Sequence, residues 1–236
     1  MSKYSQKSGK WIYRPGQMEP FRLSRSRIEM FLECLRCFYL QNRLGLGRPS
    51  MPGFSLNSAV DELLKKEFDL LRESGQAHEL MKQYGIEAIP FQHPDMDKWR
   101  ENFVGISYLH SETNLEIFGA VDDVWINKNQ ELIIVDYKST STSEEISLES
   151  EYKQAYKKQM EVYQWLFRKN GFKVSPTGYF VFANADKGLS KFDGKLEFKM
   201  SIIAYTGDDG WIEPTIFQMH ECLNSDIIPS SSEKCE

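Results

Sequence analysis

The chain has 236 residues, of which 41% are hydrophobic and 13% are aromatic. This is enough apolar material for a packed core, which excludes a wholly disordered protein. No apolar run approaches the roughly 18 residues that a membrane span needs, so no membrane association is expected.

Charge is distributed unevenly along the chain. The formal net charge is −5, but residues 1–48 contain ten Lys/Arg and three Glu, so this segment carries +7 and the remainder carries −12. The net charge argues against general binding to nucleic acid, whereas the basic segment can still contact phosphates locally. A solvated helix face explains the same charges equally well. Residues 1–16 lack the apolar stretch of a secretory signal, so a cytoplasmic protein is expected.

The first part of the chain predicts two helices after a polar leader. Residues 1–20 are expected to form a flexible or loosely packed leader. Apolar residues at spacings of three and four predict one helix from an N-cap at Ser24 to Leu40, and a second from residues 55–57 to near Gly75. Gly and Pro residues between positions 45 and 53 predict the connecting loop. Residues 76–98 show no clear period.

The middle of the chain predicts strands, and the last third alternates helices and strands. Short segments rich in β-branched and aromatic residues predict strands at 103–109, 114–118, 120–126 and 131–137, with a hairpin turn at 127–130. Further elements are predicted as a helix at 151–170, strands at 178–183 and 196–205, and a helix at 211–223. The crossover through residues 131–183 requires a parallel strand pair. The sequence therefore predicts one α/β domain over residues 21–223, with a central mixed β-sheet flanked by helices, and a polar tail at 224–236.

Two acidic residues and a lysine are predicted to meet at the end of the hairpin. Asp136 and Lys138 are two apart in a strand and project from the same face, and the turn brings the strand of Asp122 alongside. Two carboxylates suit a hard cation such as Mg²⁺ or Mn²⁺, which can activate water and polarise a phosphodiester. Lys138 can offset negative charge in the transition state. Asp-x-Lys alone is common, and by itself a structural ion pair at a strand end explains it better than a catalytic role does.

The wider pattern resembles the RecB-like branch of the PD-(D/E)XK nucleases over about residues 23–205. It consists of Gly119-x-x-Asp122, an apolar strand ending in Asp136-x-Lys138, and Gln159-x-x-x-Tyr163 on the following helix. The resemblance implies a restriction-endonuclease-like core, and it implies that Gln159 and Tyr163 help to position DNA and the catalytic groups. The alternative is that Tyr163 packs in the core and Gln159 lies on the surface.

Asp61 stands where many RecB-like nucleases carry a metal-binding His. An Asp can also bind Mg²⁺ or Mn²⁺, so the resemblance adds Asp61 to Asp122 and Asp136 as candidate metal ligands. Asp123 is interpreted as a supporting or structural residue.

The four cysteines lie toward the two ends of the chain, at Cys34, Cys37, Cys222 and Cys235. Some RecB-like nucleases, including CRISPR-associated and AddB-type enzymes, hold an iron–sulfur cluster with one cysteine from the opening helix and three near the C-terminus. Cys34 and Cys235 resemble two of these positions. Three interpretations stay open: a four-thiolate site for a cluster or Zn²⁺, an incomplete site in a truncated sequence, or ordinary apolar cysteines.

The resemblance implies a deoxyribonuclease that uses Mg²⁺ or Mn²⁺. The branch is rich in exonucleases, so an exonuclease of DNA repair, recombination or defence is expected, with a helicase or another repair or defence protein as a candidate partner. Basic side chains that could contact DNA, or form solvated helix faces, are Arg25, Arg27, Arg36, Lys157 and Lys158. The alternatives are a catalytically inactive nucleic-acid-binding module with the same fold, and an enzyme of another class that shares only Asp-x-Lys.

Overall fold

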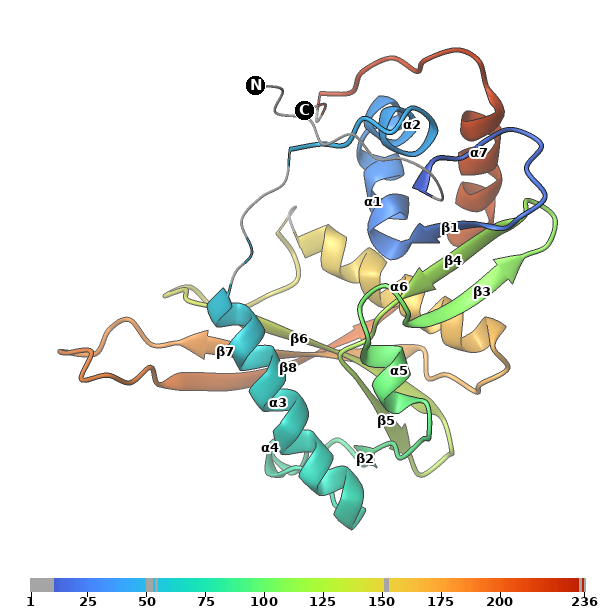
Figure 1. The fold of residues 1–236 in the computed structure, drawn as a ribbon. Helices are drawn as coiled ribbons and strands as arrows, with labels where there is room; N and C mark the ends of the chain where they lie inside the picture. Colours follow the sequence, from blue (N-terminus) through green and yellow to red (C-terminus); the bar gives the residue numbers. More distant parts are fainter. Residues whose placement is uncertain (1–10, 50–52, 54, 151–152, 234, 236) are drawn as a thin grey trace.

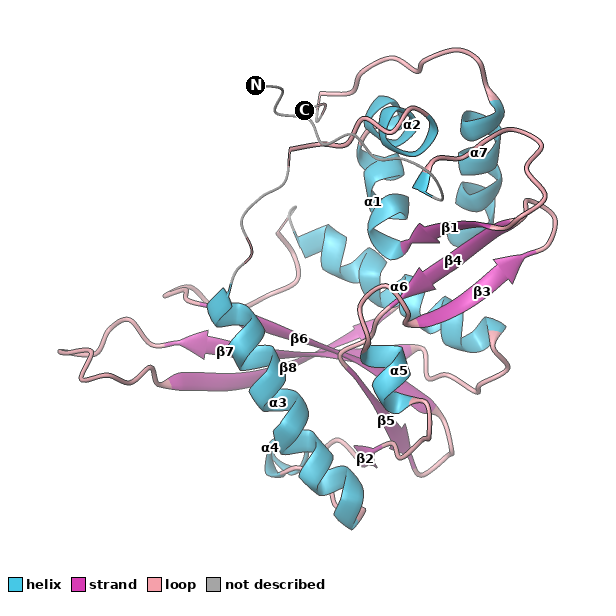
Figure 2. Ribbon diagram, viewed as in Figure 1, coloured by secondary structure: helices cyan, strands magenta, loops and turns pink. Residues whose placement is uncertain are grey.

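Two β-sheets lie next to each other in the computed structural model, with helices packed around them (Figures 1 and 2). The structure describes residues 11–49, 53, 55–150, 153–233 and 235. The larger sheet has the strand order β2-β5-β6-β7-β8, and the smaller has the order β1-β4-β3. In the larger sheet β6 and β7 run parallel and the other neighbours are antiparallel, while in the smaller sheet β1 runs parallel to β4. The strands are β1 (Phe21–Ser24), β2 (Ala88–Pro90), β3 (Ile106–His110), β4 (Leu115–Gly119), β5 (Asp123–Asn127), β6 (Leu132–Thr140), β7 (Thr177–Ala185) and β8 (Phe198–Thr206).

Helices cover the sheets from two sides. Helix α3 crosses in front of the larger sheet, and α1, α2 and α7 gather beside the smaller one (Figure 1). Helix α6 connects β6 to β7 and so provides the crossover that a parallel pair requires. The helices are α1 (Arg25–Glu33), α2 (Leu35–Arg43), α3 (Ser55–Ser74), α4 (Glu79–Gln83), α5 (Met96–Arg100), α6 (Gln154–Lys169) and α7 (Ile212–Asn224).

Strand β6 separates two hydrophobic cores. Its side chains alternate between the faces of the sheet, as the two-residue repeat of a strand requires. Leu132 and Ile134 belong to the core that contains α6, whereas Ile133 and Val135 belong to the core that contains α3. Continuing this alternation places Asp136 on the α6 side and Tyr137, which packs in the α3 core, on the other. The strand that carries the acidic residue is thus buried on both faces.

The predicted fold class is confirmed, with differences in detail. The segment predicted as one helix from Ser24 to Leu40 forms two, because Cys34 is extended (φ −157°, ψ 107°) and ends α1. The predicted strands at 103–109 and 114–118 form β3 and β4, which belong with β1 to a sheet separate from the central one, in the order β1-β4-β3. Strand β1 and the short elements α4, β2 and α5 were not predicted, because three to five residues are too few to show a period. The predicted strand at 120–126 begins only at Asp123.

Both end segments contact the domain where the structure describes them. Tyr13 is buried and its hydroxyl donates to Oδ1 of Asn224 at 3.2 Å. The Ser232 hydroxyl donates to the backbone carbonyl of Glu33 at 2.8 Å. Residues 1–10 of the expected leader lie outside the described residues. No helix in the described part of the chain is both long and apolar enough to cross a membrane.

Candidate active site

Asp136 is fully buried on β6, and both of its carboxylate oxygens face functional groups. Oδ1 accepts a hydrogen bond of 2.7 Å from Nε2 of Gln159, and Oδ2 forms an ion pair with Nζ of Lys138. Oδ2 receives no directed hydrogen bond from the described residues. Nζ of Lys138 also lies 4.7 Å from the centre of the Tyr156 ring. The carboxylate therefore has one oxygen whose lone pairs are only partly used.

Burial sets the electrostatics of this carboxylate. It raises the pKa of Asp136 to about 6; the nearby Lys138 ammonium opposes the rise and the Asp122 carboxylate adds to it. For Lys138, burial lowers the pKa, but attraction from Asp136 and Asp122 outweighs burial and the net pKa is raised. An additional positive charge at this point would therefore favour the ionised form of Asp136.

The side chain of Asp122 is hydrogen-bonded to the backbone of the same strand, β6. Oδ2 of Asp122 accepts a hydrogen bond of 2.8 Å from the backbone N–H of Tyr137, which stands between Asp136 and Lys138. Asp122 lies in a bend just before β5, so the prediction that it sits within a strand was wrong. The bend turns its side chain toward β6. The structure thus brings Asp122, Asp136 and Lys138 together at one end of the β5–β6 hairpin.

Gln159 and Tyr163 face the same place from α6. They are four residues apart on the helix, and Nε2 of Gln159 lies 3.2 Å from the Tyr163 hydroxyl. Tyr163 is buried, and a Cβ at Gly119 would come within 2.5 Å of its Cε1 atom. Gly119 is therefore needed for the ring to pass β4. Tyr163 packs in the core, and Gln159 is half-buried and contacts Asp136 directly.

A lysine that the sequence did not single out also enters the site. Nζ of Lys65, on α3, lies 2.7 Å from Oδ2 of Asp61 and 3.5 Å from Oδ1 of Asp122. Burial and the Asp122 charge raise the pKa of Asp61, although Lys65 opposes them. Asp61, Asp122, Lys138 and Gln159 line a common cleft of about 400 Å³. Two carboxylates here share one ammonium group.

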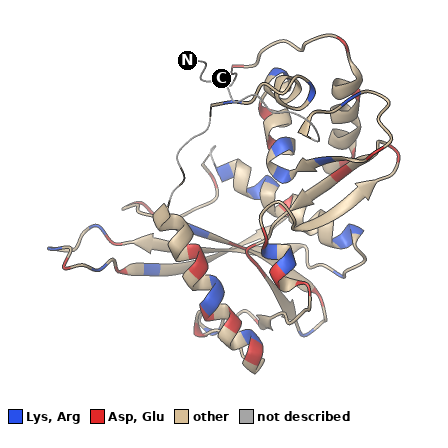
Figure 3. Cartoon of the chain, in the orientation of Figure 1, with Lys and Arg blue, Asp and Glu red and all other residues tan. Residues whose placement is uncertain are grey.

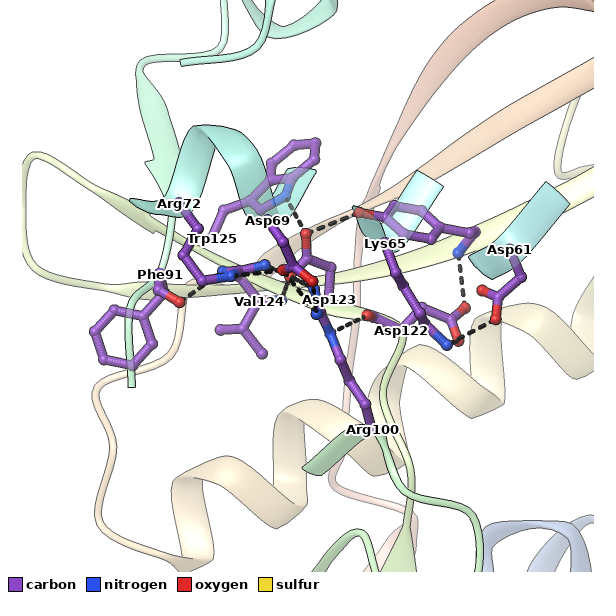
Figure 4. A network of polar contacts seen from close by, with 11 residues as sticks. Asp61, Lys65, Asp69, Arg72, Phe91, Arg100, Asp122, Asp123, Val124 and Trp125 are labelled. Atoms are coloured by element: carbon purple, nitrogen blue, oxygen red, sulfur yellow. Dashed lines mark hydrogen bonds and ion pairs between the residues drawn. The ribbon is translucent and has the colours of Figure 1, made fainter. Parts of the chain in front are cut away.

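A buried network behind the cleft holds the hairpin in place (Figure 4). Asp123 is fully buried, and its Oδ1 accepts hydrogen bonds from Arg72 Nη2 at 2.5 Å and Arg100 Nη2 at 2.9 Å. Its Oδ2 accepts from the Tyr137 hydroxyl at 2.8 Å and from Trp125 Nε1 at 3.2 Å. Asp123 therefore joins α3, α5, β5 and β6 at a single carboxylate.

Arg100 links this network to the candidate site. Its Nε donates a hydrogen bond of 2.9 Å to the backbone carbonyl of Asp122, and its Nη1 lies 2.8 Å from Oδ1 of Asp69. Burial lowers the pKa of Arg100, but the attraction of Asp123 and the hydrogen bond and charge of Asp69 together outweigh burial, so the net pKa is raised. The guanidinium thus fixes the bend that points the Asp122 side chain into the cleft. The supporting role expected for Asp123 fits this arrangement.

The donor set of the cleft suits a hard divalent cation. Carboxylate oxygens are the ligands that Mg²⁺ and Mn²⁺ prefer, and Oδ2 of Asp136 has unused acceptor capacity. Among the described residues, however, the carboxylates of Asp61, Asp122 and Asp136 do not place one oxygen each within 4.8 Å of the others. Sharing of one ion by all three therefore requires the side chains to shift and Lys65 to move from between Asp61 and Asp122.

The family model of the PD-(D/E)XK nuclease superfamily matches residues 55–221. The chain belongs to this superfamily. Membership implies a nuclease, and PD-(D/E)XK nucleases generally use divalent metal ions. None of the curated proteins matches the chain. The crystal structure of SSO0001 is similar over 44% of this chain and 40% of that chain, with 18% identity and a TM-score of 0.27, a likeness that does not inform the fold or the function.

Three of the four cysteines of this PD-(D/E)XK protein lie together. The Sγ atoms of these three, Cys34, Cys37 and Cys235, all lie within 4.8 Å of one another. The sulfurs of Cys37 and Cys235 are 3.8 Å apart. Burial raises the pKa of Cys34, but hydrogen bonds from Ser232 and Cys37 outweigh it and lower the pKa to about 6. Cys222 is not a member of this group, and burial raises its pKa to about 11. The set of four thiolates considered from the sequence is therefore reduced to three.

The basic residues considered as DNA contacts divide into several environments; Figure 3 shows Lys and Arg in blue along the chain. Arg25 forms an ion pair with Glu29, and Lys157 lies 3.7 Å from Oε1 of Glu149. Arg36 is exposed on α2. The remaining two, Arg27 and Lys158, are half-buried. Lys157 and Lys158 precede Gln159 on α6, so they lie next to the candidate site.

Proposed function

We propose that this nuclease is a Mg²⁺- or Mn²⁺-dependent deoxyribonuclease that hydrolyses phosphodiester bonds in the cleft between α3, β6 and α6. The observation that carries the proposal is the buried Asp136 carboxylate, which contacts Lys138 and Gln159 and stands beside Asp122. Burying a carboxylate in an apolar strand is costly unless it has compensating partners. Lys138 and Gln159 are such partners, and a divalent cation would add positive charge beside Asp122 and Asp136.

Each residue has a role that follows from its contacts. Asp122 and Asp136 would hold the metal ion, and Asp61 would be a further ligand. The bound ion would polarise the phosphodiester and lower the pKa of an attacking water. Lys138 orients that water and offsets the negative charge of the transition state. Gln159 holds the Asp136 carboxylate in a fixed orientation.

We infer further that the chain belongs to the RecB-like branch and acts as an exonuclease. Both inferences are supported by the order of the motifs in the chain and by the Gln159–Tyr163 pair, whose members lie 3.2 Å apart and face Asp136. An exonuclease of this kind would serve DNA repair, recombination or defence in the cytoplasm, alongside a helicase or a similar partner.

Labelled DNA tests these points together. The purified protein is incubated with linear single-stranded, linear double-stranded and covalently closed circular DNA, with Mn²⁺, with Mg²⁺ or with EDTA. Cleavage of linear DNA that requires the metal and spares circles supports an exonuclease. The Lys138→Ala variant should lose cleavage and keep DNA binding. DNA binding without cleavage by the wild-type protein would instead identify an inactive binding module.

We also propose that Cys34, Cys37 and Cys235 bind a soft metal ion or an iron–sulfur cluster. Three sulfurs that lie within 4.8 Å of one another can serve together as ligands of a soft metal. Anaerobically purified protein that absorbs at about 400 nm would contain an iron–sulfur cluster. Colourless protein with stoichiometric zinc by elemental analysis would indicate Zn²⁺. Metal-free protein whose melting temperature is unchanged by Zn²⁺ would contradict the site.

A further inference from the structure

A second cleft lies on the other side of Tyr163 from Asp136. It has a volume of about 390 Å³, which is within the range of pockets that bind small ligands. Residues from β1, the start of α1, the loop of residues 101–105 and the end of β4 line it. Gly119 and Tyr163 line it as well, and the Tyr163 hydroxyl contacts Gln159, which lines the candidate active site. The two clefts are therefore neighbours, separated by the Gln159–Tyr163 pair.

The charges facing this cleft are all positive. Its lining includes Arg22, Arg25 and Arg27, and no Asp or Glu. Arg22 pairs with Glu116 at 2.9 Å and Arg25 pairs with Glu29. Among the described residues Arg27 has no carboxylate partner, and its guanidinium contacts Sδ of Met30 at 3.8 Å. Burial lowers the pKa of Arg27, so an anion in the cleft would satisfy an otherwise unbalanced charge.

An aromatic ring stands exposed at the same cleft. Phe103 is 74% exposed and has a positive φ of 70°, which is uncommon for a residue with a Cβ. Arg22 holds this conformation, because its guanidinium donates to the backbone carbonyls of Phe103 at 3.0 Å and Val104 at 3.3 Å. The same guanidinium lies 4.2 Å from the centre of the Phe118 ring. The loop is thus anchored so that the Phe103 ring faces solvent at the rim.

Gly105 anchors the loop from its other end. A Cβ at Gly105 would lie 2.2 Å from the backbone oxygen of Gly119, and its φ of 60° is in the left-handed region. The loop of residues 101–105 therefore packs directly on the end of β4, next to the glycine that lets Tyr163 pass. This packing ties the position of Phe103 to that of the candidate active site.

We propose that this cleft binds one unpaired nucleotide of single-stranded DNA, next to the phosphodiester that is cut. The base stacks on Phe103, and its phosphate pairs with Arg27 beside the hydroxyls of Ser24 and Ser26. Single-stranded nucleic acid is commonly bound by exposed aromatic rings together with a basic groove, and stacking is available to a base that has no neighbour on that face. This inference rests on the proposed nuclease function and names the form of its substrate.

Binding is measured by fluorescence anisotropy with a short labelled oligothymidylate and a blunt duplex of the same length, in EDTA so that no cleavage occurs. Phe103→Ala should weaken single-strand binding by about 5- to 100-fold. The matched control is Phe192→Ala, which removes an equally exposed ring (68%) from the loop between β7 and β8 and should leave the affinity unchanged. Melting temperatures of both variants check that they fold.

Salt dependence tests the role of Arg27. Arg27→Ala should lower the slope of log affinity against log salt concentration by about one, and Arg27→Lys should retain the slope. Equal affinities of Phe103→Ala and Phe192→Ala for the single strand, or binding to the blunt duplex alone, would overturn the proposal. If Phe103→Ala weakens binding but the wild-type protein shows no metal-dependent cleavage, the nucleotide-binding cleft is supported and the proposed nuclease activity is contradicted.

Discussion

Gln159 donates a hydrogen bond of 2.7 Å to Oδ1 of Asp136, from the helix that follows the strand carrying the acidic residue. The contact fixes the carboxylate so that its other oxygen faces Lys138. Groups that orient a metal-binding carboxylate typically change activity or metal affinity by about 10–100-fold when removed. We therefore expect Gln159→Ala to reduce Mn²⁺-dependent cleavage by that factor. Gln154→Ala, an exposed position on the same helix, is the control, and equal rates for the two variants would show that the contact is unimportant.

The spacing of motifs predicted this contact in outline. The two-residue repeat of a strand and the four-residue repeat of a helix place Asp136 with Lys138, and Gln159 with Tyr163. Apolar residues three and four apart likewise predicted α3 and α6, and the strand–helix–strand order predicted the parallel pair. What the sequence could not indicate is the break at Cys34, since the apolar pattern continues through it. The division into two sheets was also hidden, because it depends on the pairing of a four-residue strand with β4.

Removing a partner of Asp123 should destabilise the fold. Arg72 is 8% exposed and binds Asp123, Asp69 and the backbone carbonyl of Phe91. Loss of the sole partner of a buried charge costs about 3–5 kcal/mol, but Asp123 keeps Arg100 as a second cation at 2.9 Å. Arg72→Ala should therefore lower the free energy of unfolding by less than this full amount and by more than about 1 kcal/mol, as measured by urea denaturation. The control is Lys128→Ala, which removes an exposed ion pair with Glu87 and should leave the free energy of unfolding nearly unchanged.

Lys65 should compete with the metal ion. Its ammonium stands between Asp61 and Asp122, so its removal leaves two carboxylates that repel each other until a cation binds. Lys65→Met should therefore have a lower melting temperature than wild type in EDTA, and gain more than wild type on addition of Mn²⁺. Differential scanning fluorimetry with and without Mn²⁺ measures both. If Mn²⁺ shifts wild type and variant by the same amount, Lys65 and the ion do not share a position.

Metal binding should weaken below about pH 6. Burial raises the pKa of Asp136 to about 6 in the folded protein. Without metal, the native state therefore carries a proton on Asp136 between about pH 4 and pH 6, where the unfolded chain does not. From this group alone, stability without metal rises as the pH falls through this window. A metal ion must displace the proton, so the rise in melting temperature that Mn²⁺ causes should shrink below pH 6. A pH-independent shift would argue against Asp136 as a ligand, and Asp136→Asn serves as the control.

Part of the candidate site could not have been inferred from the chain alone. Lys65 stands more than 50 positions before Asp122 in the sequence, and nothing in its surroundings indicates that it, and not the adjacent Lys66, enters the site. Arg72 and Arg100 meet Asp123 from two different helices, so their convergence depends on packing. Cys222 shows the opposite case: it lies near Cys235 in the sequence, but it is not a member of the group that Cys235 forms with Cys34 and Cys37.

The most direct test of the metal-binding claim is calorimetric titration of Mn²⁺ into the protein and its variants. Wild type should show saturable binding, and Asp122→Asn and Asp136→Asn should each lose it, because each removes a charged oxygen ligand while keeping the shape of the side chain. Circular dichroism spectra that match wild type would show that the variants remain folded. Undiminished binding in both folded variants would contradict the assignment of this cleft as the metal site of the nuclease.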